Sequence, residues 1–371
     1  MDPALLTDPT FWTNPSAFAP GGFDGVMPDI PELTGHVLFQ TSGSTGRPKW
    51  IALSKTSLLL SAACVNRHLE VSEESIWGLA LPVHHVGGFG VMARVFEAAS
   101  EYAVFAHRWN PDTFHEWLHQ AGVTHTSLVP TQVHDLVKAG LKSPASLKAI
   151  VVGGGRLDVP TGQRARDLGW PVLASYGMTE TCSQIATQPL DVLDKSYQTD
   201  GLPLLSIWKA RVAENELLEI SGPALFSGAL VHDGDAWNYI PRTNEWHRTA
   251  DRVILAGHAI TPLGRADTHV KVLGELVDIE AIEREFIALS GGKITAVDFA
   301  IIALPDARAE HQLVPVFSQS VDRHLVLEIF TTYQAEASGL KRLQPPVFVN
   351  ALPRSPLGKL LRAELGKMVN V

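Results

Sequence analysis

The sequence contains few cysteines and no long apolar run. Cys64 and Cys182 are its only two cysteines, too few for a disulfide framework or a four-sulfur zinc site. Such usage is typical of a reducing cytoplasm. No stretch reaches the roughly 18 apolar residues that a membrane helix needs, and the first residues lack the basic start of a secretion signal. We therefore expect a cytoplasmic protein that does not insert into membranes.

An excess of positive charge is also absent. The formal net charge of -9 and the pI of about 5.9 leave no basic surface to attract nucleic acid or an anionic membrane. The chain has no internal repeat and no extended low-complexity tract. Its 371 residues, 45% of them hydrophobic, can bury a large core and predict about two or three domains. Any binding of anionic ligands must therefore be local.

A loop rich in glycine and hydroxyl groups follows the apolar run 37–39. Residues 41–49 read Thr-Ser-Gly-Ser-Thr-Gly-Arg-Pro-Lys. The glycines let successive backbone N–H groups point inward, the hydroxyls add donors and Lys49 adds a positive charge, so the loop suits an oligophosphate. Its spacing departs from the P-loop pattern G-x-x-x-x-G-K-[ST]. On composition alone a flexible linker is the commoner interpretation, and the rest of the chain has to decide.

Short apolar runs alternate with helical patterns from His36 onward. The runs are residues 36–40, 77–81, 101–106, 125–129, 148–152 and 171–174. This alternation indicates a mostly parallel sheet of the α/β class. Residues 110–121 predict one of the helices, with Asn110 as its cap and Pro111 at its first position. The first thirty residues are rich in proline and glycine and predict an irregular lead-in.

The pattern changes after residue 203. Short strand-like runs at 208–212, 217–220 and 252–256 predict a smaller β-rich subdomain. Beyond residue 264 the chain predicts helices at 279–289 and 325–335 and strands at 296–304 and 313–317. We therefore predict a large N-terminal α/β domain with a β-rich subdomain over residues 1–264. A small mobile α+β domain over residues 265–371 follows it.

Five separated motifs occur in an order that matches one enzyme superfamily. They are the loop 41–49; Ser175-Tyr176-Gly177-Met178-Thr179-Glu180-Thr181; Arg248-Thr249-Ala250-Asp251; Gly264-Arg265-Ala266-Asp267 continuing to Lys271, Gly274 and Glu280; and Leu352-Pro353-Arg354-Ser355-Pro356-Leu357-Gly358-Lys359-Leu360-Leu361-Arg362. Together they resemble the acyl-adenylate-forming superfamily of acyl-CoA synthetases, peptide-synthetase adenylation domains and luciferases. Each motif alone is weak, but five in order are hard to obtain by chance.

The resemblance implies an ATP-dependent ligase that joins a small carboxylic acid to CoA through an acyl-adenylate, releasing AMP and pyrophosphate. ATP and Mg²⁺ are the implied cofactors, and CoA is the co-substrate. Within the superfamily, residues 81–94, the run S-L-V-P-T-Q at 127–132 and residues 175–184, which end in T-E-T-x-S-Q, most resemble the 2-succinylbenzoate:CoA ligases of menaquinone synthesis.

The resemblance also implies which residues bind the nucleotide. They are Thr41, Ser42, Gly43, Ser44, Thr45, Gly46, Lys49, Gly154, Gly155, Tyr176, Asp251 and Arg265. The loop 41–49 should hold the β- and γ-phosphates. Tyr176 should offer its ring to adenine, and Asp251 should accept hydrogen bonds from the ribose hydroxyls. A core aromatic is the alternative for Tyr176, and a surface arginine paired with Asp267 is the alternative for Arg265.

One departure from the family lies beside Asp251. Ala250 stands where the family has glycine. If that position requires a positive φ, alanine would strain the turn.

The resemblance implies three catalytic residues, Lys359, Thr179 and Glu180. Lys359 should bridge the substrate carboxylate and the α-phosphate, and Thr179 should donate to the α-phosphate. Glu180 should help to hold Mg²⁺, with a surface carboxylate as the alternative. Asp267 resembles the hinge about which the C-terminal domain rotates after adenylation. That rotation would withdraw Lys359 and bring the region of Lys271 and Gly274 to the thiol channel.

The acid that the resemblance implies, 2-succinylbenzoate, has a second carboxylate and a ketone. Its pocket therefore needs a positive or donor group beyond the reacting end. Arg94, Ser127 and Thr131 are the candidates. The glycines at 87–88 should make room for the aromatic ring. His85 should gate or line the pocket, and a structural histidine is the alternative.

Several alternatives stay open at this stage. The acid could be another aryl or medium-chain acid, the thiol could belong to a carrier protein, or the chain could be a catalytically degenerate nucleotide-binding relative. Only about forty residues precede the loop 41–49, where the family carries a sizeable subdomain. We expect activity to survive, with exposed apolar surface covered by the proline-rich lead-in or by the second subunit of a homodimer.

Overall fold

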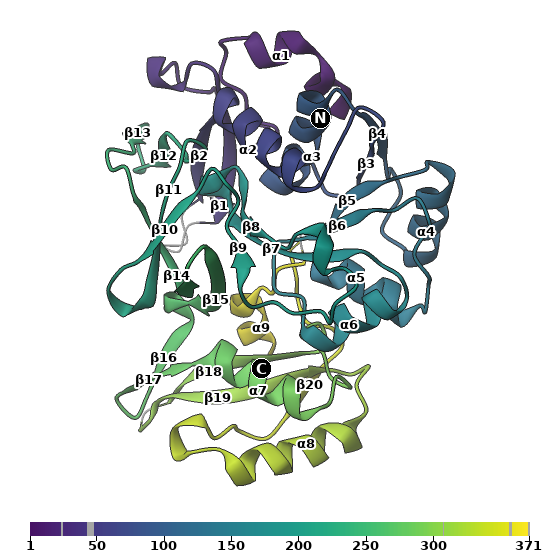
Figure 1. Cartoon of the computed structure of the whole chain (residues 1–371). Helices are drawn as coiled ribbons and strands as arrows, with labels where there is room; N and C mark the ends of the chain where they lie inside the picture. Colours follow the sequence, from purple (N-terminus) through teal and green to yellow (C-terminus); the bar gives the residue numbers. More distant parts are fainter. Residues whose placement is uncertain (24, 43–47, 307, 356–357, 370–371) are drawn as a thin grey trace.

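A six-stranded sheet forms the centre of the large domain (Figure 1). The computed structural model describes residues 1–371 except 24, 43–47, 307, 356–357 and 370–371. The strands, in the spatial order β4-β3-β5-β6-β7-β8, are β3 (Ile76–Leu79), β4 (Glu101–Val104), β5 (His125–Leu128), β6 (Ala149–Val152), β7 (Val172–Met178) and β8 (Ser183–Thr187). All neighbours are parallel except β7 and β8, which are antiparallel. The predicted α/β class is confirmed.

Helices cover both faces of this sheet. They are α2 (Lys55–His68) and α3 (Val86–Ala98) on one face and α4 (Pro111–Gln120), α5 (Pro130–Lys138) and α6 (Val159–Asp167) on the other. Successive strand residues point to opposite faces, so Val151 packs with the first group of helices and Ile150 with the second. The predicted helix at 110–121 is confirmed as α4, where the side chain of Asn110 accepts a hydrogen bond from the Thr113 N–H.

The run 36–40 belongs to a different sheet from the one we predicted. It lies in β1 (His36–Ser42), in a four-stranded antiparallel sheet with β2 (Pro48–Ser54), β12 (Gly228–His232) and β13 (Trp237–Pro241). The chain returns directly from β1 to β2, and a connection this short can join only antiparallel strands. The register pairs Thr41 with Lys49 and Ser42 with Pro48.

The β-rich subdomain is an antiparallel five-stranded sheet in the order β10-β11-β14-β15-β9, and it agrees with the sequence prediction. Its strands are β9 (Leu202–Pro203), β10 (Lys209–Val212), β11 (Leu217–Ser221), β14 (His247–Ala256) and β15 (Ala259–Arg265). Strand β15 leads directly into the last part of the chain.

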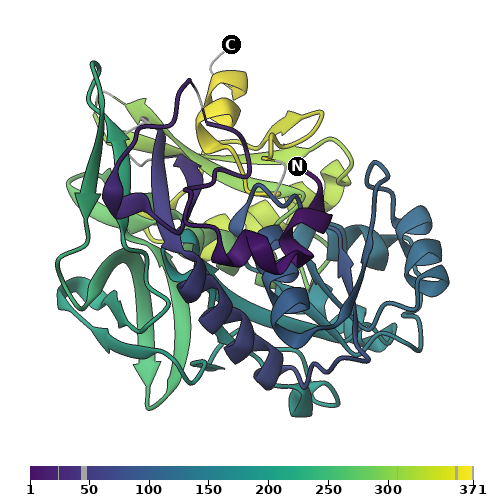
Figure 2. The same ribbon diagram turned by 90° about the horizontal axis from the view of Figure 1, so that it is seen from above.

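The lead-in is more regular than we predicted. Its prolines start short helices rather than only breaking structure: Pro3 opens a 3₁₀ turn (Pro3–Thr7) and Pro9 opens α1 (Pro9–Thr13). Phe11 is buried, and the Lys55 ammonium of α2 donates to the carbonyl oxygens of Phe11 and Asn14 at 2.7 Å each. In the view from above, this purple segment lies over the helices of the large domain (Figure 2).

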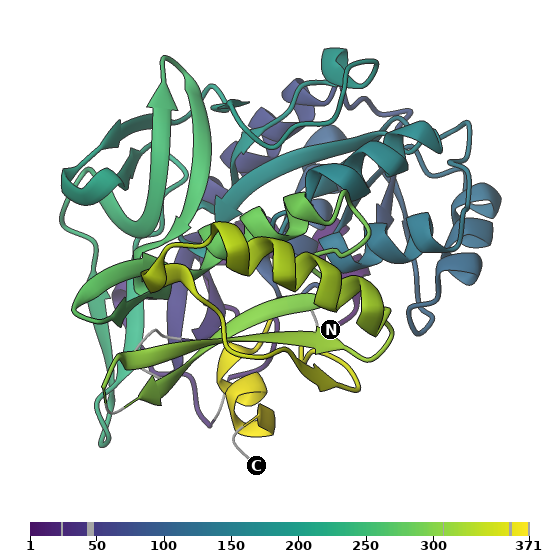
Figure 3. The ribbon, with the colours of Figure 1, turned by 90° about the horizontal axis from the view of Figure 1, so that it is seen from below.

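The C-terminal module starts after β15 and has its own core. Its elements are β16 (His269–Val272), β17 (Glu275–Asp278), α7 (Ile279–Leu289), β18 (Phe299–Asp306), β19 (Glu310–Ser318), α8 (Arg323–Glu336), β20 (Val347–Val349) and α9 (Arg362–Val369). Helices α7 and α8 lie side by side on one face of the sheet β18-β19-β20 (Figure 3), and α9 packs on the other. The boundary at residues 264 and 265 stays a prediction. No helix among the described residues is long and apolar enough to span a membrane.

Candidate active site

The predicted site residues gather at one edge of the six-stranded sheet. Thr131 follows β5, Gly154 follows β6, Tyr176 lies near the end of β7, and His85 precedes α3 after β3. In open α/β sheets, ligands bind outside the carboxyl ends of the parallel strands. Gly154 has φ 76°, a conformation that favours glycine, in the turn between β6 and α6. Gly155 lies in the same turn, where an added side chain would contact Pro130.

At the phosphate end, a lysine and a glutamate from distant segments form an ion pair. The Nζ of Lys49 on β2 lies 3.2 Å from the Oε1 of Glu180, which belongs to the 3₁₀ turn Thr179–Thr181 after β7. Thr41 lies opposite Lys49 in the hairpin, and Ser42 ends β1. The predicted phosphate contacts at residues 43–46 lie outside the described residues. The structure thus brings the predicted phosphate lysine next to the predicted magnesium carboxylate.

The predicted nucleotide residues also meet. The Tyr176 hydroxyl donates to the Oδ2 of Asp251 at 2.5 Å, and the Nη1 of Arg265 donates to its Oδ1 at 3.4 Å. Asp251 and Arg265 face each other across β14 and β15. Burial, followed by the charge and the hydrogen bond of Asp251, raises the pKa of Tyr176 well above its usual value. Tyr176 is therefore a permanent donor to Asp251 at neutral pH.

Ala250 does not strain this region. It lies inside β14, and it is not among the described residues with a positive φ. Strand geometry suits alanine as well as glycine, so the condition for the expected strain is not met.

Arg94, the predicted acid-binding residue, belongs to helix α3 and is buried. Its side chain is only 2% exposed, and its guanidinium donates to the hydroxyls of Ser127 at 3.4 Å and Ser183 at 3.3 Å. The guanidinium also lies over the Trp77 ring, 5.2 Å from its centroid. Burial lowers the pKa of Arg94 to about 10, which still leaves it charged at neutral pH. Among the described residues no carboxylate lies within ion-pair distance of it.

A backbone glycine lets the loop of Lys359 approach Thr131. Gly358 has φ 71°, and a Cβ added there would lie 2.7 Å from the Thr131 Oγ1. Arg354 holds the loop by donating to the Gly358 carbonyl oxygen at 2.8 Å, and the Gly358 N–H donates to the Ser355 carbonyl at 2.8 Å. Lys359 itself is exposed. The structure therefore brings the predicted catalytic loop against the predicted acid-binding segment.

The sequence model of the AMP-binding enzyme family matches residues 27–229, more than half of the chain. The chain belongs to the AMP-binding enzyme family. This result confirms the superfamily that the five motifs predicted.

Relatives of this AMP-binding enzyme include proteins named 2-succinylbenzoate–CoA ligase. The one from Bacillus cereus is 26% identical over 360 residues, covering 90% of this chain and 70% of the relative. The one from Staphylococcus epidermidis is 32% identical over 206 residues, covering 55% of this chain and 41% of the relative. The resemblance to these ligases, predicted from residues 81–94, 127–132 and 175–184, is thereby confirmed.

Solved structures share the fold of this AMP-binding enzyme. The o-succinylbenzoate CoA synthetase of Bacillus subtilis, in complex with an acyl-adenylate intermediate, superimposes with a TM-score of 0.73 at 23% identity, covering 89% of this chain and 68% of that one. The ATP-bound MatB of Rhodopseudomonas palustris gives a TM-score of 0.74 at 22% identity, with 90% and 67% covered.

In this AMP-binding enzyme, Gly88 does not make room for a ligand ring, contrary to our prediction for the glycines at 87–88. A side chain on Gly88 would collide with the backbone of Leu81 and Pro82, so its missing side chain leaves no space for a ligand. Gly90 is also closely packed, because an added Cβ would lie 3.4 Å from both the guanidinium of Arg94 and the hydroxyl of Ser183. His85 is partly buried, and burial, followed by the nearby His84, lowers its pKa. His85 is therefore neutral at neutral pH, and its role as a pocket residue stays a prediction.

Lys271 and Gly274 lie away from this site. Both belong to the β16–β17 hairpin, where the Lys271 carbonyl accepts from His311 and the Gly274 N–H donates to Glu310 at 2.9 Å. These contacts are all inside the C-terminal module. Gly358, the neighbour of Lys359, lies against Thr131, whereas these hydrogen bonds of Lys271 and Gly274 are with the β18–β19 region of the module. The side chain of Asp267, the predicted hinge residue, lies outside the described part of the chain.

Sequence reasoning missed two partners of Arg94. Ser183 belongs to the T-E-T-x-S-Q run, but we gave it no role there. In the structure Ser183 has φ 117° and Cys182 has φ 56°, both in the region that favours glycine, and this backbone cannot be read from the sequence. Trp77 gave no local signal, because its contact with Arg94 depends on how α3 packs on the sheet.

Proposed function

We propose that this AMP-binding enzyme is an ATP-dependent acid:CoA ligase that forms an acyl-adenylate, and that its acid is 2-succinylbenzoate. The family match and the names of its relatives support the reaction class. The arrangement of Arg94 carries the choice of acid. The proposal places the enzyme in the cytoplasm, where ATP and CoA are available.

Arg94 favours an acid with two carboxylates. A buried guanidinium that meets only hydroxyls and an aromatic face is poorly compensated, because an isolated buried charge costs several kcal/mol. A ligand carboxylate would supply the missing anion, and Ser127 and Ser183 could donate to it as well. After one carboxylate of 2-succinylbenzoate has reacted, the second is available to pair with Arg94. An acid with a single carboxylate would leave Arg94 without an anion.

The first half-reaction is adenylation. A carboxylate oxygen of the acid attacks the α-phosphorus of ATP, the bond from that phosphorus to the bridging oxygen breaks, and pyrophosphate leaves. Lys359 would stabilise the negative charge that develops between the two anions, and Thr179 would donate to the α-phosphate. Lys49 would exchange Glu180 for a phosphate oxygen. No proton transfer is needed in this step.

Glu180 fits the role of magnesium residue. Its carboxylate is a hard oxygen donor held beside Lys49, the predicted phosphate lysine. It would hold Mg²⁺, which neutralises part of the charge of the phosphates.

The second half-reaction transfers the acyl group to CoA. The thiol sulfur attacks the acyl carbonyl carbon, the bond from that carbon to the phosphate oxygen breaks, AMP leaves, and the thiol proton goes to solvent. Tyr176, Asp251, Arg265, Gly154 and Gly155 would hold the adenosine through both steps. We propose that the C-terminal module rotates about Asp267 between the steps, because in this orientation the Lys359 loop, and not Lys271 or Gly274, lies at the site.

A pyrophosphate-release assay across a panel of acids tests the proposal. The panel contains 2-succinylbenzoate, benzoate, phthalate and a medium-chain fatty acid, each with CoA, without CoA, and with a carrier protein bearing a phosphopantetheine thiol. We expect release with 2-succinylbenzoate and thioester formation with free CoA. Release only with monocarboxylates would overturn the choice of acid, and thioester formation only on the carrier would overturn the choice of thiol. No release with any acid would favour a degenerate relative.

A further inference from the structure

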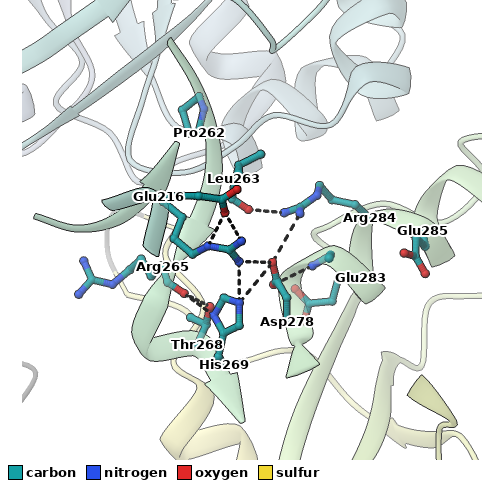
Figure 4. Close-up of polar contacts among 12 residues, drawn as sticks. Glu216, Pro262, Leu263, Arg265, Thr268, His269, Asp278, Glu283, Arg284 and Glu285 are labelled. Carbon is teal, nitrogen blue, oxygen red and sulfur yellow. Dashed lines mark hydrogen bonds and ion pairs between the residues drawn. The ribbon is translucent and has the colours of Figure 1, made fainter. Parts of the chain in front are cut away.

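A cluster of charged side chains joins the C-terminal module to the large domain beside the predicted hinge (Figure 4). At its centre is Asp278, which ends β17 and whose side chain is 18% exposed. Its Oδ2 lies 3.6 Å from the Nη1 of Arg252 on β14 and 3.9 Å from the Nη2 of Arg284 on α7. A carboxylate between two guanidinium groups in a mostly buried place is a stronger ionic contact than an exposed pair.

The two oxygens of Asp278 do different work. Oδ1 accepts from the Ala281 N–H at 3.0 Å and so caps helix α7 inside the module. Oδ2 faces Arg252, which belongs to the other domain. Capping alone therefore does not account for the position of this carboxylate.

His269 connects the cluster to the hinge segment as a neutral group. Its Nε2 lies 2.7 Å from the Nη1 of Arg252, and a guanidinium can only donate, so Nε2 must be the acceptor. The proton of the ring is then on Nδ1, which donates to the Arg265 carbonyl oxygen at 3.3 Å. A protonated His269 would set two cations against each other. The 3.9 Å approach of His269 to Asp278 is thus no ion pair in this arrangement.

Further contacts orient the arginines on both sides of the contact between the C-terminal module and the large domain. Arg252 also donates through Nε to Glu216 at 3.1 Å, which orients its guanidinium from the large-domain side. Arg284 donates through Nη1 to the Leu263 carbonyl of β15 at 2.9 Å. Arg252 directly follows Asp251, the predicted ribose residue, on the same strand. The cluster therefore links the module to the strand that carries the nucleotide site.

We infer that Asp278 is a positioning residue that holds the C-terminal module in the orientation where the Lys359 loop lies on Thr131. This inference rests on the proposed two-step reaction. Asp278 stabilises the adenylation orientation through Arg252 and contributes nothing to the rotated one, because rotation of the module about Asp267 would carry Asp278 away from Arg252. Loss of its charge shifts the population toward the rotated orientation.

Asp278→Asn tests the inference with little change to the helix, because asparagine caps helices about as well as aspartate. Glu285→Gln is the matched control: Glu285 lies on the same helix, and its ion pair with Lys341 stays inside the module. For Asp278→Asn we expect pyrophosphate release to fall about tenfold, while thioester formation from supplied acyl-adenylate and CoA is unchanged or faster. Glu285→Gln should change neither step. Equal loss of both steps, or no change in either, would overturn the inference.

A distance measurement separates this inference from the proposed function. Spin labels at Leu60→Cys on α2 and Leu327→Cys on α8 occupy exposed positions, 42% and 51% exposed, one in each part of the molecule, and both native cysteines are buried. We expect one main distance in the otherwise native protein and a second population with Asp278→Asn. Identical distributions would contradict the inference even if the enzyme is active. If Asp278→Asn shows a second distance population but the protein adenylates no acid, the positioning role of Asp278 stands and the proposed function is overturned.

Discussion

The two ends of the site treat charge in opposite ways. At the predicted nucleotide end, Lys49 pairs with Glu180, and Asp251 receives Tyr176 and Arg265. At the predicted acid end, Arg94 meets hydroxyls and an aromatic ring but no described carboxylate. Under the proposed function, binding at the first end would exchange partners, whereas binding at the second end would supply an anion that the described residues do not offer. We therefore expect selectivity among ligands to be steeper at the acid end.

Lys359→Ala should have the largest effect, because Lys359 is proposed to act where the two ends meet. We expect adenylation to fall by about 100-fold or more, since a fixed charge at a developing anion is a large part of such catalysis. Thioester formation from supplied acyl-adenylate should continue. Pyrophosphate release and CoA consumption measure the two steps, and Lys367→Ala, at an exposed position on α9, is the control. Equal loss of both steps would contradict the domain rotation.

Arg94→Met should break the contrast between the ends. We expect kcat/KM for 2-succinylbenzoate to fall about 100-fold, because the second carboxylate loses its partner. The KM for ATP should stay the same. The free energy of unfolding should be unchanged or higher by about 1 kcal/mol, because a buried charge without an anion is removed. Arg94→Lys, which keeps the charge, should retain part of the activity, and an Arg94→Met enzyme with full activity would refute the choice of acid.

Asp251→Asn should sharpen the contrast from the nucleotide side. We expect the KM for ATP to rise about tenfold, because a neutral acceptor binds the ribose hydroxyls more weakly than a carboxylate. The KM for the acid should change little. Initial rates with each substrate varied in turn measure both constants, and a larger effect on the acid than on ATP would count against the assignment of Asp251.

Tyr176→Phe should have the smallest effect. The ring that would face adenine remains, and the lost hydroxyl bond to Asp251 is one that a ribose hydroxyl would replace. We expect the KM for ATP to change by no more than about threefold and the free energy of unfolding to fall by about 1 kcal/mol. Thermal denaturation and ATP titration measure the two quantities. A rise in the KM for ATP above that of Asp251→Asn would show that the hydroxyl itself binds the nucleotide.

The sequence predicted the elements better than their partners. Residues 110–121, 279–289 and 325–335 carry helix periodicity and capping residues, and each is a helix in the structure. The run 36–40 was correctly predicted as a strand but assigned to the wrong sheet. The sheet that it joins also contains β12, which comes from residues 228–232. Pairing over such a distance leaves no local pattern.

The site shows the same limit. Motifs identified Arg94, Tyr176 and Asp251, because each belongs to a run that resembles a known family. The bond from Tyr176 to Asp251 and the contacts of Arg94 with Ser183 and Trp77 join segments far apart in the chain. Gly88 was given a role in ligand binding because a missing side chain suggests space, but the backbone of Pro82 fills that space. Only the packing decides between these uses of a glycine.

Gly358 has no side chain, and this affects how the C-terminal module docks on the large domain. A Cβ added at Gly358 would lie 2.7 Å from the Thr131 Oγ1, which is too close unless one of the two residues moves. The loop and Thr131 are therefore packed with no free space between them, and a partly docked module would gain little of this contact. Under the proposed rotation, we expect the loop to dock cooperatively, so that Lys359 is either at the reacting groups or away from them. We expect Gly358→Ala to allow both substrates to bind but to hinder docking of the Lys359 loop and so slow their reaction.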